Sequence, residues 1–314
     1  DGISVDRNGR IVAVGNGYDP CQTPGGVPVW AAARYLPDGG LDPGFGTGGL
    51  VFRTFGSKGA KLSAVATDTG GRVVVAGYAP YKRGQLPAVA RYTADGAPDV
   101  SFAGTGLLLR PDSRSTGDIR SIAIQSDGKI ILLGRAEGVS SVFRLNEDGS
   151  LDTGFNGSGQ YLDSSLGGVH DVITQWVGGE EQIVVAGGTA WYEVPGNRAA
   201  VLRLSHAGAL VGKSVVNTDV DSYFTALAVD STTNRLFAAG YIAHEVAVGK
   251  QLLVASFDES GIPVATFGDG GVVILAKHKP VEAATGIAVQ ADGCIVVGGK
   301  SNDCAAACGP DAGS

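Results

Sequence analysis

The stretch Ile122-Ala-Ile-Gln-Ser-Asp-Gly-Lys-Ile-Ile-Leu-Leu-Gly134 has two apolar segments, one on each side of an Asp-Gly pair. Apolar residues alternate in the first segment, which is typical of a strand with one buried face. An Asp-Gly pair between two such segments is the strongest short-range signal for a tight β-hairpin. The stretch therefore predicts two antiparallel strands that end at a glycine.

This pattern recurs along the whole chain, and each copy is called here the first hairpin of a unit. The closing glycines of successive copies lie 53 to 62 residues apart. The six copies are Ile3–Gly15, Val65–Gly77, Ile122–Gly134, Val172–Gly187, Leu227–Gly240 and Ile287–Gly298. A period of this length predicts a repeat protein.

A different hairpin, called here the second hairpin, lies between successive first hairpins. The clear copies are Ala33–Gly49, Ala90–Gly106, Phe143–Gly159 and Ser256–Gly271, and a worn copy begins at Leu202. Each unit then has four strands and no helical stripe, which predicts an all-β fold with the four-stranded antiparallel blades of a β-propeller. A β-sandwich would not require units this similar, and solenoids use shorter coils.

The expected architecture is a single propeller domain over residues 1–299, most simply with six blades. The units run over about 1–61, 62–118, 119–168, 169–222, 223–283 and 284–299, and a cysteine-containing tail follows at 300–314. Only five second hairpins accompany the six first hairpins. The last blade is therefore expected to be incomplete, or to be closed by strands from the chain ends.

The combined pattern, Asp-Gly-Lys-Ile in the first hairpin and Arg-Leu followed by Asp-Gly-Ser-Leu-Asp and Phe in the second, resembles the delta-60 repeat of bacterial surface and secreted proteins. The resemblance implies a propeller-like fold, but the family has no settled activity and names no catalytic residue. Three positions depart from the pattern: Val211 and Val264 replace the second-hairpin aspartate, and Ser256 replaces the arginine.

Charge and composition exclude some functions. The net charge is −7 and no basic cluster stands out, so nucleic acid is not an expected partner. No apolar run has the length of a membrane span. The 50 glycines have no Gly-X-Y period, which excludes collagen and assigns glycine to turns.

The four cysteines lie near the two ends of the chain, at Cys21, Cys294, Cys304 and Cys308. An even count in a turn-rich chain indicates disulfides and an extracellular, periplasmic or cell-surface location. The first and last units of a closed ring are neighbours, so a disulfide from Cys21 to a C-terminal cysteine is one hypothesis. Unpaired buried thiols are the alternative, and no metal or cofactor is predicted.

The recurrent arginines of the second hairpins, Arg34, Arg91 and Arg144, need a partner if they lie inside a sheet. The aspartates eight residues later are the obvious choice, although Arg203 has none. These pairs are predicted to be structural.

Connectivity divides the loops between two faces of the ring. The turns inside both hairpins share one face, the turn face, and the longer connections share the other, the loop face. Variable loops on a rigid scaffold usually carry binding. The ligand-binding candidates on the loop face are Tyr18, Tyr78, Tyr81, Arg83, Trp191, Tyr192 and Tyr241. Their rings could instead cap the ends of the blades.

Two histidines of the loop face have an acidic neighbour in sequence, giving the pairs His170–Asp171 and His244–Glu245. Either pair could serve as an acid and base, and His278 could join both histidines at a metal; solvated loop histidines are the simpler interpretation. The favoured function is a non-enzymatic secreted or cell-surface propeller that binds a glycan or a protein. The alternative is a hydrolase or lyase that uses one of these pairs.

Overall fold

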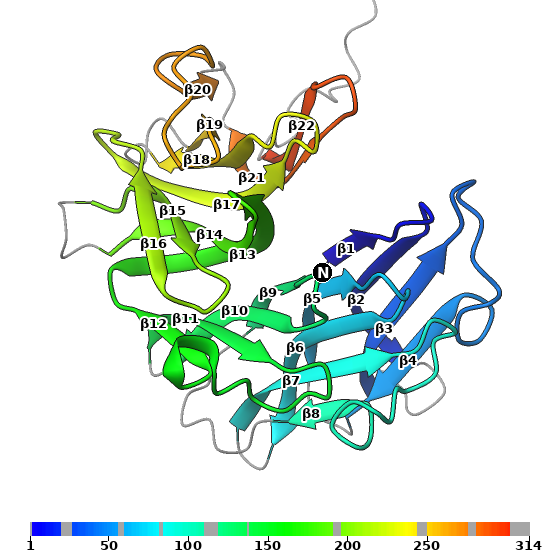
Figure 1. Ribbon diagram of the computed structural model, residues 1–314. Coiled ribbons are helices and arrows are strands. Elements are labelled where there is room, and N and C mark those ends of the chain that lie inside the picture. Colours follow the sequence, from blue (N-terminus) through cyan, green and yellow to red (C-terminus); the bar gives the residue numbers. More distant parts are fainter. Residues whose placement is uncertain are drawn as a thin grey trace, which may run out of the picture.

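The structure is a computed structural model that describes residues 2–19, 27–55, 60–81, 84–109, 119–136, 138–190, 196–243, 250–275 and 281–301. Within each sheet, strands that follow each other in the chain pair antiparallel. Within these ranges they form five sheets of four strands and one sheet of two. Figure 1 shows the sheets arranged around a common centre in the manner of propeller blades.

The sheets are numbered 1 to 6 in chain order. Sheet 1 consists of β1 (Gly2–Val5), β2 (Ile11–Asp19), β3 (Val27–Tyr35) and β4 (Leu50–Thr54). Sheet 2 consists of β5 (Lys61–Thr67), β6 (Val73–Tyr81), β7 (Gly84–Tyr92) and β8 (Leu107–Leu109). Sheet 3 consists of β9 (Ile119–Ile124), β10 (Ile130–Ala136), β11 (Val139–Leu145) and β12 (Gln160–Asp163). Sheet 4 consists of β13 (Leu166–Val177), β14 (Glu180–Thr189), β15 (Ala199–Leu204) and β16 (Leu210–Val215). Sheet 5 consists of β17 (Asp221–Val229), β18 (Leu236–Ala243), β19 (Lys250–Phe257) and β20 (Val272–Leu275). Sheet 6 consists of β21 (Val281–Val289) and β22 (Ile295–Ser301).

The first strand of each sheet contacts the first strand of the next, so β1, β5, β9, β13, β17 and β21 form the inner wall of the array. A short helix, η1 (Phe155–Gly157), lies between β11 and β12. In the described part of the chain, no helix has the length and apolar character needed to cross a membrane.

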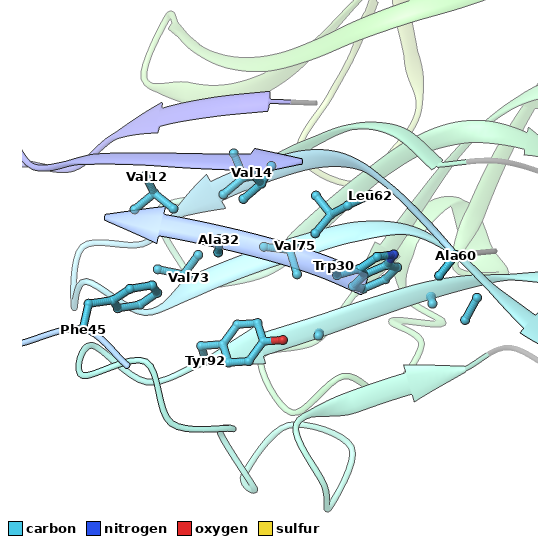
Figure 2. Packing of buried hydrophobic residues seen from close by; sticks show 14 residues of the cluster. Val12, Val14, Trp30, Ala32, Phe45, Ala60, Leu62, Val73, Val75 and Tyr92 are labelled. Atoms are coloured by element: carbon cyan, nitrogen blue, oxygen red, sulfur yellow. The ribbon is translucent and has the colours of Figure 1, made fainter. Parts of the chain in front are cut away.

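Apolar side chains fill the space between successive sheets. Between sheets 1 and 2, Trp30, Phe45, Val75 and Tyr92 belong to one buried cluster (Figure 2). Comparable clusters lie between the later pairs of sheets, from sheets 2 and 3 to sheets 5 and 6. A strand between two such clusters is buried on both faces, which explains the continuous apolar runs of the first hairpins.

A repeated polar contact, called here the joint, connects each of the first three sheets to the next one at the turn face. In sheet 2, Arg91 Nε donates to the carboxylate of Asp99 at 2.7 Å, and the guanidinium carbon lies 5.0 Å from the centre of the Phe102 ring. Arg91 Nη1 also donates to the main-chain oxygen of Glu147, in the second-hairpin turn of sheet 3. The joint therefore holds one sheet together and fixes it to its neighbour.

The same ion pair occurs in sheets 1 and 3, where Arg34 pairs with Asp42 at 2.8 Å and Arg144 pairs with Asp152 at 2.7 Å. The predicted pairing of the two series is therefore confirmed. In sheet 4, where the aspartate is missing, Arg203 donates to the side-chain oxygen of Gln175 at 2.7 Å.

The phenylalanine of each joint packs on a glycine in the turn of the next sheet. A Cβ atom at Gly149 would lie only 2.8 Å from the ring of Phe102, so the ring fits because this residue has no side chain. The amide of the following residue, Ala103, donates to the main-chain oxygen of Asp148 in the same turn at 2.8 Å. The phenylalanines of sheets 1 and 3 make equivalent contacts.

Sheet 6 differs from the others, because only its first hairpin, β21–β22, is present among the described residues. The prediction of four-stranded blades thus holds for five sheets, and the sixth has two strands. No strand pairing in the described ranges connects sheet 6 to sheet 1, so the chain ends do not close the array by hydrogen bonds there.

Cys294 lies in the turn of this hairpin as an exposed free thiol, so this position, predicted as a disulfide candidate, has no disulfide in the structure. The other three candidates, Cys21, Cys304 and Cys308, lie outside the described residues, as does the proposed disulfide between the chain ends.

Candidate functional site

Five inner strands carry an extra residue, a β-bulge, near the loop face, and in β13 and β21 the pairing shifts a second time, at Gly167 and Glu282. In β13 the pairing with β14 shifts between Val169 and Asp171, which makes His170 the extra residue. In β17 the shift lies between Phe224 and Ala226. A bulge leaves its extra residue unpaired and changes the direction of its side chain.

The glycine that ends the first hairpin lies opposite each of these bulges, and in sheets 2, 4, 5 and 6 the close approach of the two chains requires it. A Cβ atom at Gly240 would lie 1.8 Å from the main-chain oxygen of Tyr223. In unit six the glycine in this position is Gly299, where a Cβ atom would lie 2.5 Å from the oxygen of Ala283. The glycine equivalent to the other closing glycines is therefore one residue later than the predicted Gly298.

The extra residues next to the closing glycines are all polar. They are Ser63, Arg120, His170, Thr225 and Thr285. Two of them reach the next inner strand: Arg120 Nη1 donates to the oxygen of Val169 at 3.2 Å, and Thr225 Oγ1 donates to the oxygen of Ala284 at 2.7 Å. The bulges thus place a polar band along the inner wall.

Part of this band lines an open pocket of about 410 Å³. Its lining residues come from the loop-face ends of sheets 4, 5 and 6: His170, Thr225, Lys250, Ala283, Ala284, Thr285 and Lys300. The volume lies within the range of small-ligand sites. The lining includes two lysines and no carboxylate among the described residues, although the whole chain has a net charge of −7.

His170 is mostly shielded from solvent in the wall of this pocket. Burial, together with the positive charge of Arg120, lowers the pKa of His170 to about 4. Its ring meets the ring of Tyr223 edge to face, with 6.2 Å between the centres. At neutral pH this histidine is therefore an uncharged hydrogen-bonding group.

Two tyrosines and a lysine extend the site from His170 into sheet 5. The rings of Tyr223 and Tyr241 have centres 5.4 Å apart, and Lys250 Nζ lies 4.0 Å from the centre of the Tyr241 ring. Burial raises the pKa of Tyr223 to about 12, so its hydroxyl keeps its proton. The cluster offers aromatic surface, a hydroxyl donor and a positive charge.

Asp171, the neighbour of His170 in sequence, has a different environment. Its carboxylate accepts hydrogen bonds from the hydroxyl of Ser121 at 2.8 Å and from the amides of Val172 and Leu227, both at 2.9 Å. Burial raises the pKa of Asp171. These bonds connect β9, β13 and β17, and no hydrogen bond joins Asp171 to His170 in the described structure.

The structure brings together two of the residues that the sequence singled out, His170 and Tyr241, through the ring of Tyr223. Tyr78 is half-buried in sheet 2, which packs against sheets 1 and 3. The remaining candidates lie outside the described residues, or only their main chain is described: Tyr18, Tyr81, Arg83, Trp191, Tyr192, His244 and Glu245. Within the described ranges, no three residues among His, Cys, Asp and Glu gather as metal ligands.

Sequence reasoning missed Tyr223, Thr225, Lys250, Thr285 and Lys300. It searched the loops, whereas these residues lie in strands. A signal was present, because each closing glycine indicates an irregular inner strand opposite it. Pairing register would be needed to identify the bulged residue.

A protein-family model described as "Domain of unknown function (DUF5122) beta-propeller" matches three segments of the chain, residues 7–45, 71–102 and 125–155. Each segment begins in or next to the turn of a first hairpin and ends at the phenylalanine of a joint: Phe45, Phe102 or Phe155. No curated protein matches the sequence.

Solved structures, among them a propeller, resemble the fold at low sequence identity. The Dos1 propeller has a TM-score of 0.51 and 9% identity, and the match covers 95% of this chain and 66% of that one. A streptogramin B lyase has a TM-score of 0.50 and 12% identity, over 96% of this chain and 90% of that one. A variant of the Synechocystis apocarotenoid oxygenase has a TM-score of 0.51 and 9% identity, and the match covers 88% of this chain and 60% of that one. The fold is propeller-like, and three of its units match the family model of the DUF5122 β-propeller.

Proposed function

We propose that this protein is a six-bladed propeller that binds a glycan in the pocket around His170 and does not transform it. The observation that carries the proposal is the composition of the pocket, which combines two lysines, two threonine hydroxyls and a neutral histidine beside two tyrosine rings that contact each other at a tilt. Aromatic rings with polar tips suit the alternating apolar and hydroxyl surfaces of a sugar.

The charge of the pocket favours an acidic glycan, such as an oligosaccharide with uronic acid residues. Lys250 and Lys300 both line the pocket, and no described lining residue carries a negative charge to neutralise them. The low pKa of His170 means that the histidine adds no charge at neutral pH. A carboxylate between the two lysines would gain charge-assisted hydrogen bonds.

Calorimetric titration of uronic acid oligosaccharides, with neutral oligosaccharides of the same length beside them, tests this proposal. Lys300→Ala is expected to weaken acidic-sugar binding about tenfold, the equivalent of about 1.4 kcal/mol. Lys61→Ala is the matched control, because Lys61 is exposed at the loop-face end of sheet 2 and is absent from the pocket lining. It is expected to leave the affinity unchanged.

Other outcomes separate the alternatives. Absence of binding to any acidic or neutral glycan would contradict the proposal and favour a protein ligand. Turnover of a bound sugar that is lost in His170→Ala would favour the hydrolase or lyase. The location outside the cytoplasm is a further proposal, supported by the cysteine content of the chain.

A further inference from the structure

Sheet 5 presents half of a joint to sheet 6. Phe267 occupies the same repeat position as Phe45, Phe102 and Phe155, which are fully buried, but Phe267 is only half-buried. The turn of the next sheet covers each of the three buried rings. Sheet 6 has no second hairpin among the described residues, and therefore supplies no turn to cover Phe267.

The main chain beside Phe267 shows the same incompleteness. The amides of Gly46, Ala103 and Asn156, which follow the three buried phenylalanines, each donate to a carbonyl in the turn of the next sheet. The amide of Gly268 holds the equivalent position and has no hydrogen bond to any described residue. The amide of Gly268 is therefore a free donor, within the described structure, at the place where the next turn would lie.

Sheet 1 presents the complementary half of a joint. Gly39 in its second-hairpin turn has a φ of 88°, close to the 86° of Gly149 in the corresponding turn of sheet 3. Gly149 packs on the phenylalanine of the preceding sheet, whereas a Cβ atom at Gly39 would have no atom of the described residues within 4 Å. The turn of sheet 1 is thus shaped to receive a ring that is absent.

The flat faces of the two terminal sheets are uncovered as well. Ile3 on β1 is 68% exposed, whereas the residues at its position in the next four inner strands are almost completely buried: Val65, Ile122, Val172 and Leu227. Val296 on β22 is 52% exposed, and its five counterparts are also buried: Val12, Val74, Ile131, Val184 and Phe237. Both exposed residues belong to faces that every other sheet buries against a neighbour.

We propose that the free edge of β22, Phe267 and the turn at Gly39 form a docking site for one β-hairpin with the second-hairpin sequence of this repeat. The first strand of the hairpin pairs with the edge of β22 that faces away from β21, which has no partner strand among the described residues. The turn glycine of the hairpin covers Phe267, and a turn carbonyl accepts the amide of Gly268. The phenylalanine of the hairpin lies on Gly39, so that one hairpin completes both halves.

The order of the repeat identifies which hairpin this is. In units one to five the second hairpin is followed in the sequence by the next inner strand, after two residues between β12 and β13 and up to nine between β8 and β9. The second hairpins of sheets 1 to 5 are already paired within their own sheets. The occupant is therefore a further hairpin of this kind, and a link of this length would place it before β1 in the order of the repeat.

The test is a fusion that places a copy of residues 138–165 directly before Gly2. This segment contains the second hairpin of sheet 3 with its two-residue link. The expected results are a rise in Tm of about 5 °C or more and slower hydrogen exchange at the Gly268 amide, by about tenfold or more. The matched control fusion carries Gly149→Val in the added copy only, which blocks the contact with Phe267.

A second measurement avoids any folding defect of the fusion. A synthetic peptide of residues 138–165, added to the 314-residue chain, is expected to protect the Gly268 amide, and the same peptide with Gly149→Val is not. The proposal is overturned if neither the fusion nor the peptide changes Tm or Gly268 exchange, or if the control fusion acts as strongly. It is also overturned if the chain is a dimer that Val296→Lys dissociates, because a second copy would then be the occupant.

Discussion

Two pairs of neighbouring sheets in the same repeat differ in their contacts: sheets 2 and 3, and sheets 5 and 6. Between sheets 2 and 3, Arg91, Asp99 and Phe102 form a complete buried joint. At the equivalent positions of sheet 5 the chain has Ser256, Val264 and Phe267, and no turn of sheet 6 meets them within the described residues. The repeat therefore sets the backbone of each unit, while the joints determine how firmly one unit is held to the next.

This difference bears on function, because the candidate pocket lies at the less firmly held end. Its lining comes from sheets 4, 5 and 6, and four of its seven residues belong to the two-stranded sheet 6. Ligand-binding regions are often drawn from the less stable parts of a protein. We expect glycan binding to stabilise the contact between sheets 5 and 6 more than the contacts among sheets 1 to 3.

The largest expected effect is the loss of a joint aspartate. Asp99→Ala leaves the buried guanidinium of Arg91 without its ion-pair partner and is expected to lower the free energy of unfolding by about 3–5 kcal/mol. Val264→Ala, at the equivalent position of sheet 5, is expected to lower it by less than about 1 kcal/mol. Urea denaturation measures both values, and equal losses would remove the distinction between the two regions.

The joint phenylalanines provide the second contrast. Phe155→Ala removes a fully buried ring and is expected to lower the free energy of unfolding by about 3–5 kcal/mol. Phe267→Ala removes a half-buried ring, for which we expect about 1–2 kcal/mol, because part of its surface is already in water. If Phe267→Ala destabilised the protein as much as Phe155→Ala, this ring would have to be covered in solution.

A third prediction concerns pH and the pocket. The pKa of His170 is lowered to about 4 in the folded protein, against about 6.5 for an unperturbed histidine. The unfolded chain therefore binds more protons between these values, and stability is lost as the pH falls from about 6.5 to 4. Chemical denaturation at each pH measures the free energy of unfolding. Over this pH range, that free energy is expected to fall by about 2–3 kcal/mol less in His170→Gln than in the unchanged protein. An identical pH profile for both proteins would show that His170 is accessible to protons when folded.

The smallest contrast uses two glycines with nearly the same backbone conformation. Gly149→Ala is expected to cost about 2–3 kcal/mol, from the positive φ and from a clash between the new Cβ atom and Phe102. Gly39→Ala, with the same φ and open space around it, is expected to cost about 1 kcal/mol. Thermal unfolding of the two variants measures the difference, and equal shifts would show that the turn at Gly39 is already covered.

Much of the fold could be predicted from short signals. The Asp-Gly turns locate the hairpins, and the eight-residue spacing from Arg91 to Asp99 predicts an ion pair that the structure contains. The contact of the Phe102 ring could not be predicted in this way, because its partner, Gly149, lies in the next unit of the chain. Sequence spacing reports local pairing well and contacts between units poorly.

The candidate site was harder to predict than the fold. Tyr241 and His170 were recognised because they lie near loops, but Tyr223, which joins them, looks like an ordinary strand residue. A bulge changes which face a residue points to, and its position depends on pairing between two strands. Asp171 shows the same limit, because adjacency to His170 in sequence did not become a hydrogen bond in space.

Residue-resolved hydrogen exchange on the 314-residue chain under native conditions, at the amides of Ala103 and Gly268, tests the difference between the joints most directly. Both follow the phenylalanine of a second hairpin, but only the amide of Ala103 is hydrogen-bonded to the turn of the next sheet. We expect strong protection at Ala103 and fast exchange at Gly268. Equal protection at the two amides would contradict this expectation, because the joint between sheets 5 and 6 would then be complete.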